Sequence, residues 1–220
     1  MLDRSLKVGV EVVSVGIGER GWATVSLEGE DEIVAERYVE EHWGRTCDLS
    51  ELHEGDIRRG KIVDLGNVGY GIYVDVGVFD EGDSPVDVLL PAYSLKKHLG
   101  VRGSISVKAL AGRLGLLENF PLDTRIFKID EVKLEVEGRL TNSQARRIGR
   151  GRHRFYVCGE TRRKIKYAIQ KTGNAERVVR TKRLGLLETE VQCSKDSDPY
   201  EIIRQIGPML NADIAVCGGL

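Results

Sequence analysis

A glycine-rich hairpin pattern at residues 60–77, GKIVDLGNVGYGIYVDVG, constrains the fold of this chain more than any other segment. Two runs rich in β-branched and aromatic residues, Arg59–Leu65 and Tyr70–Val76, flank a turn that contains Gly66 and Gly69. Runs separated by so short a turn pair as neighbouring antiparallel strands, and glycines within strands permit tight coiling. We therefore expect a small, strongly twisted sheet at this point in the chain.

Two tyrosines in the second run predict a surface for stacking bases. Tyr70 and Tyr73 are three residues apart, which places them on opposite faces of a flat strand. Gly71 lies between them and permits a bulge or a sharp coil that turns both rings toward one surface. Exposed rings stack unpaired bases of any sequence and contribute roughly 1–3 kcal/mol per base. The alternative is that one of the two rings packs in the core.

This hairpin resembles the first hairpin of S1-type OB-fold RNA-binding domains. Residues 86–95, VDVLLPAYSL, are similar to the third strand and following turn of those domains, and residues 103–109, GSISVKA, are similar to their fourth strand. The resemblance implies a five-stranded barrel over about residues 55–118, with RNA contacts at Tyr70 and Tyr73. The expected barrel strands are 57–65, 70–76, 86–90, 104–110 and 113–117.

The segment also departs from the S1 pattern. Pro91 stands where those domains often carry a histidine, and acidic residues at 80, 81, 83 and 87 would repel phosphate. A degenerate S1 domain that binds protein therefore stays open as an alternative. The lysines near the hairpin that we expect to contact phosphate are Lys61, Lys96, Lys97 and Lys108.

Positive charge is concentrated in the last third of the chain. The formal net charge is −1, yet residues 146–183 contain fourteen Lys and Arg against only Glu160 and Glu176. Arginines interleaved with aromatic residues suit phosphate pairing combined with stacking on RNA. The alternative is a solvated cationic face. The candidate RNA contacts are Arg146, Arg147, Arg150, Arg152, Arg154, Arg162, Arg163, Lys164 and Lys166.

The remaining patterns predict an α+β protein in three parts. These parts are an N-terminal β-β-α segment at 1–50, an S1-like OB-fold domain at 51–125 and a basic α+β domain at 126–220. Strands are expected at 6–15, 22–27, 133–140, 153–158, 176–183, 186–192 and 212–217, and helices at 30–43, 94–100, 141–149, 161–172 and from Asp198 onward. The hexapeptide RLGLLE occurs at 113–118 and again at 183–188, which indicates either a repeated hairpin or chance.

Several classes of function find no motif. The sequence has no Walker loop, no dinucleotide fingerprint and no GxSxG, and its four cysteines and four histidines lack metal-site spacing. We expect buried free thiols, no metal, no cofactor and no catalytic residues. No apolar run is long enough to span a membrane, and we expect a soluble cytoplasmic protein. Asn and Gln number only five and four, a bias typical of thermophiles.

The whole chain resembles an uncharacterised archaeal protein family, which suggests a habitat rather than an activity. Taken together, the patterns predict a non-catalytic RNA-binding protein connected with transcription or translation, with single-stranded or structured RNA as its partner. Two alternatives stay open. One is a module that docks on proteins of the transcription or translation machinery, and the other is a metal-dependent nuclease whose carboxylates are dispersed in the sequence.

Overall fold

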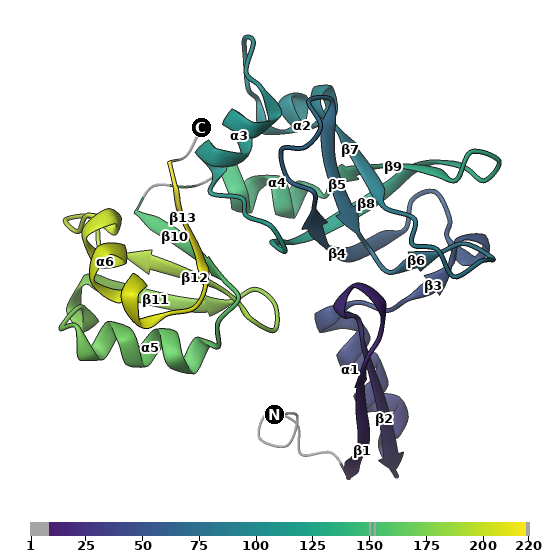
Figure 1. The fold of residues 1–220 in the computed structure, drawn as a ribbon, viewed down its shortest axis with the longest axis horizontal. Helices are drawn as coiled ribbons and strands as arrows, with labels where there is room; N and C mark the ends of the chain where they lie inside the picture. The colour runs from purple at the N-terminus through teal and green to yellow at the C-terminus, as the bar shows by residue number, and fades with distance from the viewer. Residues whose placement is uncertain (1–8, 150, 152, 219–220) are drawn as a thin grey trace.

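The computed structural model describes residues 9–149, 151 and 153–218 (Figure 1). The fold is mixed α+β, as predicted, with a closed five-stranded barrel in the middle and smaller sheets on either side. No helix in the described part of the chain is both long and apolar enough to cross a membrane. Short 3-10 turns lie at Glu19–Gly21, Leu49–Glu51, Ala175–Arg177 and Gly207–Met209.

The N-terminal unit is a β-hairpin followed by one helix. Strands β1 (Val10–Ile17) and β2 (Ala23–Gly29) pair antiparallel, and α1 (Glu32–Trp43) packs on β2 and ends before Gly44. One face of the hairpin is apolar, whereas Ser14 and Ser26 share a hydrogen bond on the other. This is the expected β-β-α segment, and its long axis projects away from the barrel (Figure 1).

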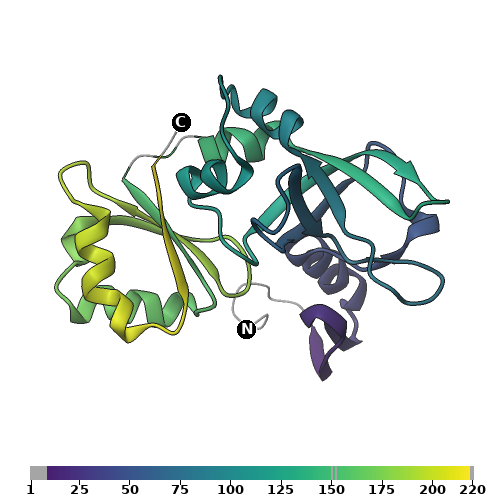
Figure 2. The same cartoon turned by 45° about the horizontal axis from the view of Figure 1, so that its top comes forward.

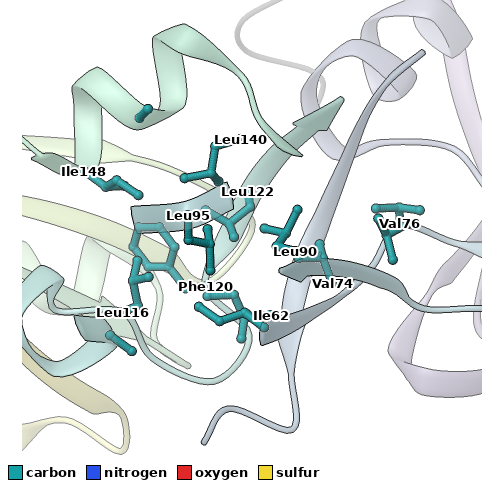
Figure 3. Packing of buried hydrophobic residues seen from close by; sticks show 14 of the residues in the cluster. Ile62, Val74, Val76, Leu90, Leu95, Leu116, Phe120, Leu122, Leu140 and Ile148 are labelled. Atoms are coloured by element: carbon teal, nitrogen blue, oxygen red, sulfur yellow. The ribbon is translucent and has the colours of Figure 1, made fainter. Parts of the chain in front are cut away.

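The barrel is closed by strands in the order β4-β5-β7-β9-β8. Neighbouring strands are antiparallel except β7 and β9, which gives the connectivity of an OB-like barrel. Its interior is filled by side chains such as Ile62, Val74, Leu90 and Leu122 (Figure 3). The barrel strands are β4 (Ile57–Val63), β5 (Gly71–Asp75), β7 (Val88–Pro91), β8 (Pro121–Asp130) and β9 (Glu135–Leu140), and β3 (Cys47–Asp48) pairs with β6 (Val78–Phe79) outside them.

The strands expected at 104–110 and 113–117 are wrong. Two helices, α2 (Ala92–Leu99) and α3 (Val107–Leu114), lie between the third and fourth barrel strands. Ser106 caps α3 by accepting a hydrogen bond from the amide of Ala109 at 3.1 Å, and the buried residues of α3 recur at helical spacing. The closing strands β8 and β9 come later, so the barrel extends to Leu140 instead of ending near residue 118.

The C-terminal unit has the element order β-α-β-β-α-β. Its sheet has the strand order β11-β12-β10-β13 with antiparallel neighbours, which is the split βαβ arrangement. Helices α5 and α6 cover one face of this sheet through a core that includes Phe155, Ile165 and Ile202. Its elements are β10 (Arg154–Cys158), α5 (Arg162–Lys171), β11 (Val178–Arg183), β12 (Glu188–Cys193), α6 (Pro199–Ile206) and β13 (Asp213–Cys217).

The other face of this sheet packs on the barrel. Tyr156 projects from β10 on that face, is fully buried, and meets Phe120 edge to face with ring centroids 4.7 Å apart. Cys158, Leu184 and Cys217 belong to the same apolar cluster as the barrel interior, and α4 (Asn142–Gly149) connects the two units. The sheet is therefore a shared layer between α5 and α6 on one side and the barrel on the other (Figures 1 and 2).

Candidate nucleic-acid interface

Tyr70 and Tyr73 lie together on the outer surface of the barrel. Their hydroxyl groups are 2.9 Å apart, and their rings meet edge to face with centroids separated by 6.3 Å. Tyr70 is 57 % exposed and Tyr73 is half-buried. A side chain at Gly71 would place its Cβ atom 2.5 Å from Leu89 Cδ1 and 2.6 Å from the Leu90 carbonyl oxygen. Glycine is therefore what permits β5 to approach β7 between the two tyrosines.

The phenol of Tyr73 is held in its neutral form. Its hydrogen bond with Tyr70, its partial burial and the negative charges of Glu135 and Asp87 raise the pKa of Tyr73 to about 12. At neutral pH the ring pair therefore carries no charge of its own that would oppose a phosphate group. Of the two carboxylates, Asp87 forms an ion pair with Arg20, at 2.7 Å.

The tip of the N-terminal hairpin covers the other end of the same barrel face. Trp22 Nε1 donates to both carboxylate oxygens of Asp75, at 3.0 and 3.1 Å, and Arg20 pairs with Asp87 at 2.7 Å. Lys61 Nζ donates to the carbonyl of Arg20 and lies 3.9 Å from Asp75. Lys61 is thus engaged within the protein, so the hairpin tip competes with any phosphate for this side chain.

The other three predicted lysines, Lys96, Lys97 and Lys108, lie on the two helices α2 and α3. Lys108, exposed on α3, lies along the β4–β5 turn, because its Cγ and Cδ atoms are 3.6 Å from the position of a Cβ atom on Gly66. Lys96 and Lys97 occupy the last turn of α2, where Lys97 is exposed and Lys96 is half-buried. The structure brings Lys108 to the turn that leads into Tyr70, and it leaves Lys96 and Lys97 at the far end of a helix.

Two of the predicted arginine contacts are structural. Arg154 is only 8 % exposed, and its guanidinium lies 3.3 Å from Glu190 and donates to the carbonyl of Arg147. Arg147 is half-buried near the carbonyl of Pro121, and burial lowers the pKa of Arg147. Both side chains lie where α4 meets the C-terminal sheet and are engaged within the protein, so we leave them out of the proposed RNA contacts. Arg146 is exposed on α4, whereas Arg150 and Arg152 lie outside the described residues.

A basic surface covers α5 and the neighbouring edge strand β11. Lys164 is held by Glu160 at 2.6 Å, which lowers the pKa of Glu160. Lys171 Nζ lies 5.7 Å from the centre of the exposed Tyr167 ring. Only Lys164 and Arg177 form ion pairs within the described segment 162–183. We name the other residues the α5–β11 surface: Arg162, Arg163, Lys166, Tyr167, Lys171, Arg180, Lys182 and Arg183.

The α5 part of the α5–β11 surface and the tyrosine pair do not form one continuous face. Helix α5 packs on the side of the C-terminal sheet that faces away from the barrel, since Ile165 and Ile169 join the outer core while Tyr156 joins the barrel core. On β11, Arg180 and Lys182 lie in the rows of Arg154 and Tyr156, and therefore on the barrel-facing side of the sheet. Four cations of the surface, at 171, 180, 182 and 183, are not among the predicted contacts. The charge count over 146–183 already included them.

A further hollow lies between the end of α1 and strand β4. It has a volume of about 930 Å³ and a mixed lining, with Glu40, Glu51, Arg45, Arg59 and Asp123 among its residues. Within the described residues, no three His, Cys, Asp or Glu side chains cluster closely enough to hold a metal ion.

Two family models match this chain, one over the unit that contains the barrel and one over the C-terminal unit. Residues 52–150 match the model of the DUF2110 central domain, and residues 152–217 match the model of the DUF2110 C-terminal domain. The chain carries both DUF2110 domains. The DUF2110 central domain contains the barrel with α2, α3 and α4, and the DUF2110 C-terminal domain contains the split βαβ sheet. No family model assigns the barrel to the S1 type.

Similarity to solved structures is distant. One is an uncharacterized protein from Methanocaldococcus jannaschii, with 13 % identity, a TM-score of 0.27, and coverage of 41 % of this chain and 93 % of that one. Another is a multidomain protein with nucleic acid binding domains from Streptococcus pneumoniae, with 8 % identity and a TM-score of 0.25. The match covers 88 % of this chain and 48 % of that protein, so this chain spans about half of its length. Comparison with curated proteins gives no match.

Proposed function

We propose that this DUF2110 protein is a non-catalytic RNA-binding protein that serves transcription or translation. The observation that carries the proposal is the exposed edge-to-face pair of Tyr70 and Tyr73 on the outer surface of β5. In OB-fold barrels the face of the second and third strands, with the loops beside it, binds oligonucleotides. Strand β5 is the second barrel strand, so the tyrosines occupy that face, and Lys108 flanks the turn before it.

The barrel alone would bind RNA weakly. Asp87 and Glu135 act on the tyrosine pair, and Lys61 is engaged by the hairpin tip. The α5–β11 surface would supply most of the electrostatic affinity, because its seven cations lack a carboxylate within 4.0 Å among the described residues. Tyr167 adds one stacking ring to that surface. The proposal therefore has two separate contacts, one that stacks bases and one that binds phosphates.

Fluorescence anisotropy with labelled single-stranded RNA, duplex RNA and single-stranded DNA tests the proposal. If five to seven cations contact phosphate, log Kd for a single strand should change with log salt by about 3.5 to 5. The double variant Tyr70→Ala/Tyr73→Ala should weaken single-strand binding by roughly 5- to 100-fold, as the loss of stacking on one base implies. The salt dependence should be preserved in that variant.

The matched control is Tyr200→Ala, since Tyr200 is 65 % exposed on α6 and lies outside both surfaces. Binding that the double variant leaves intact would remove the stacking role. Absence of binding to all three nucleic acids at 100 mM salt would contradict RNA binding itself. Labelled RNA incubated with Mg²⁺ or Mn²⁺ in the same series would reveal cleavage if the protein is a nuclease.

A docking role is the second candidate, and the N-terminal hairpin favours it. Val15 and Ile17 on the apolar face of β1 are 66 % and 84 % exposed. The large apolar residues of β2 are half-buried, so the exposed part of this face is on β1, and so small a sheet is marginally stable by itself and gains from a partner. If nucleic acids fail to bind, this face would be the first place to look for a protein of the transcription or translation machinery.

A further inference from the structure

The outer face of β8 and β9 carries a row of two arginines that no acidic residue compensates. In the register of the two strands Arg125 lies directly opposite Arg139. The rows on either side of it pair opposite charges. Arg59 lies opposite Asp123, with their side chains 3.0 Å apart, and Lys128 lies opposite Glu137. Of these three rows only the middle one places like charges opposite each other, and the row at the far end of the two strands pairs two acids, Asp130 and Glu135.

This row is costly for the free protein. Directly opposed side chains on neighbouring strands have Cβ atoms about 5 Å apart, and like charges in that position are destabilising. Within the described residues neither Arg125 nor Arg139 has a carboxylate within 4.0 Å, since the ion pairs on this face use other residues. Their neighbour on β4 in the same row is Ile57, which is apolar and 55 % exposed. An anion seated between the two guanidinium groups would relieve the repulsion.

Both guanidinium groups are held in place. The guanidinium group of Arg139 lies over the ring of Phe127, with its central carbon 3.3 Å from the ring centroid. Phe127 is the extra residue of a bulge between Ile126 and Lys128, and 43 % of it is exposed. Arg125 is anchored by a hydrogen bond from Nη1 to the carbonyl of Gly55 at 2.8 Å. Each guanidinium group is therefore fixed in position and still has N–H donors that can bind phosphate oxygens.

The geometry points to a phosphate-binding site formed by Arg125 and Arg139, with Phe127 as the support for Arg139. The ligand is a phosphate group, either free or part of a nucleic-acid backbone. The site is distinct from the tyrosine pair, because β8 and β9 are not neighbours of β5 in the barrel. The row beside it reaches the end of β11, because Arg59 donates to the carbonyl of Leu184, whereas α5 lies on the far side of the C-terminal sheet. The site does not depend on the proposed RNA function.

Thermal unfolding of the full chain with inorganic phosphate, at ionic strength held constant with chloride, tests the site. The parent protein should gain in Tm as phosphate is added. Arg139→Gln should have an equal or higher Tm without phosphate, because the like-charge contact is gone, and should bind phosphate at least 10-fold more weakly. Phe127→Leu leaves Arg125 and Arg139 in place but removes the ring that supports the Arg139 guanidinium group. It should weaken phosphate binding several-fold.

Lys128→Gln is the matched control, because it removes a cation from the adjacent row and should keep the phosphate response. Tyr70→Ala/Tyr73→Ala should also keep it, so failure of this site and failure of the proposed RNA function are distinguishable. An abasic phosphodiester oligomer separates the two sources of phosphate. Tighter binding of the oligomer supports a nucleic-acid backbone, and equal binding supports free phosphate. A parent Tm that phosphate leaves unchanged, or an Arg139→Gln response like that of the parent, overturns the inference.

Discussion

Single residues explain why the charge pattern of the C-terminal third overstated the number of surface contacts. Arg154 stands within an Arg-rich run, yet it is buried and paired with Glu190 through the fold of β10 against β12. Arg163, a few residues later, is exposed. Because both residues belong to the same basic segment of the sequence, both are predicted to contact RNA. Their roles differ because Arg154 is on the face of β10 that α4 covers, where carbonyls of Arg147 and Ile148 accept from it, whereas Arg163 is on the exposed side of α5.

Arg154→Ala should therefore destabilise the protein by about 3–5 kcal/mol, since it leaves Glu190 buried without its partner. Urea unfolding followed by circular dichroism measures this difference. Arg163→Ala is the matched control and should change the free energy of unfolding by less than about 0.5 kcal/mol. Equal effects of the two substitutions would contradict the buried role of Arg154.

Tyrosine ionisation provides a pH prediction at the same scale. The raised pKa of Tyr73, about 12, means that the folded state keeps this proton while an unfolded chain releases it near pH 10. The stabilising contribution is thus complete below pH 10 and is lost as the pH rises from about 10 to 12. Phenolate absorbance should show late ionisation of Tyr73, and Tyr70→Phe should shift it toward the ordinary range. An unchanged titration in that variant would rule out the hydrogen bond as the main cause.

At the scale of elements, most strands are predicted correctly from the sequence. The prediction is wrong for the last two barrel strands, which the resemblance to S1 domains places at 104–110 and 113–117. The alternation of Leu122, Thr124 and Ile126 toward the interior marks β8 clearly, but the resemblance to S1 domains places the last barrel strand at 113–117, before β8 begins. The repeated hexapeptide shows the limit of local signals. At 113–118 it ends α3 and enters a loop, and at 183–188 it joins β11 to β12. Tertiary contacts decide between the two structures.

The N-terminal hairpin depends on its tip for attachment to the barrel. Trp22→Ala removes the ring beside Gly77 and the hydrogen bonds to Asp75. We expect limited proteolysis to cut the chain near residues 44–47 many times faster in this variant, while the barrel and C-terminal sheet stay protected. Val132→Ala, in the exposed β8–β9 turn, is the control and should leave the cleavage rate near 44–47 unchanged. A parental cleavage pattern in Trp22→Ala would contradict attachment through the tip.

At the scale of the whole molecule, the tyrosine pair and the cations of α5, the two surfaces proposed to bind RNA, lie on different sides of the C-terminal sheet. One short RNA should therefore reach only one of them, and the effects of variants on the two surfaces should add independently. Arg163→Gln/Lys166→Gln should lower the salt slope of single-strand binding by about 1.4, at 0.7 for each lost phosphate contact. The tyrosine double variant should not change that slope. Strong coupling between the two sets of substitutions on a six-nucleotide RNA would contradict separate surfaces.

The shared layer has a consequence for how the protein unfolds. Phe120 from the DUF2110 central domain and Tyr156 from the DUF2110 C-terminal domain are both fully buried against each other, and the same cluster includes Leu184 and Cys217. Removing either domain would expose this apolar surface to water on the one that remains. The two domains should consequently melt in one calorimetric transition, with equal van't Hoff and calorimetric enthalpies. The boundary near residue 151 therefore separates two DUF2110 domains in the sequence, whereas we expect the two to unfold as one cooperative unit.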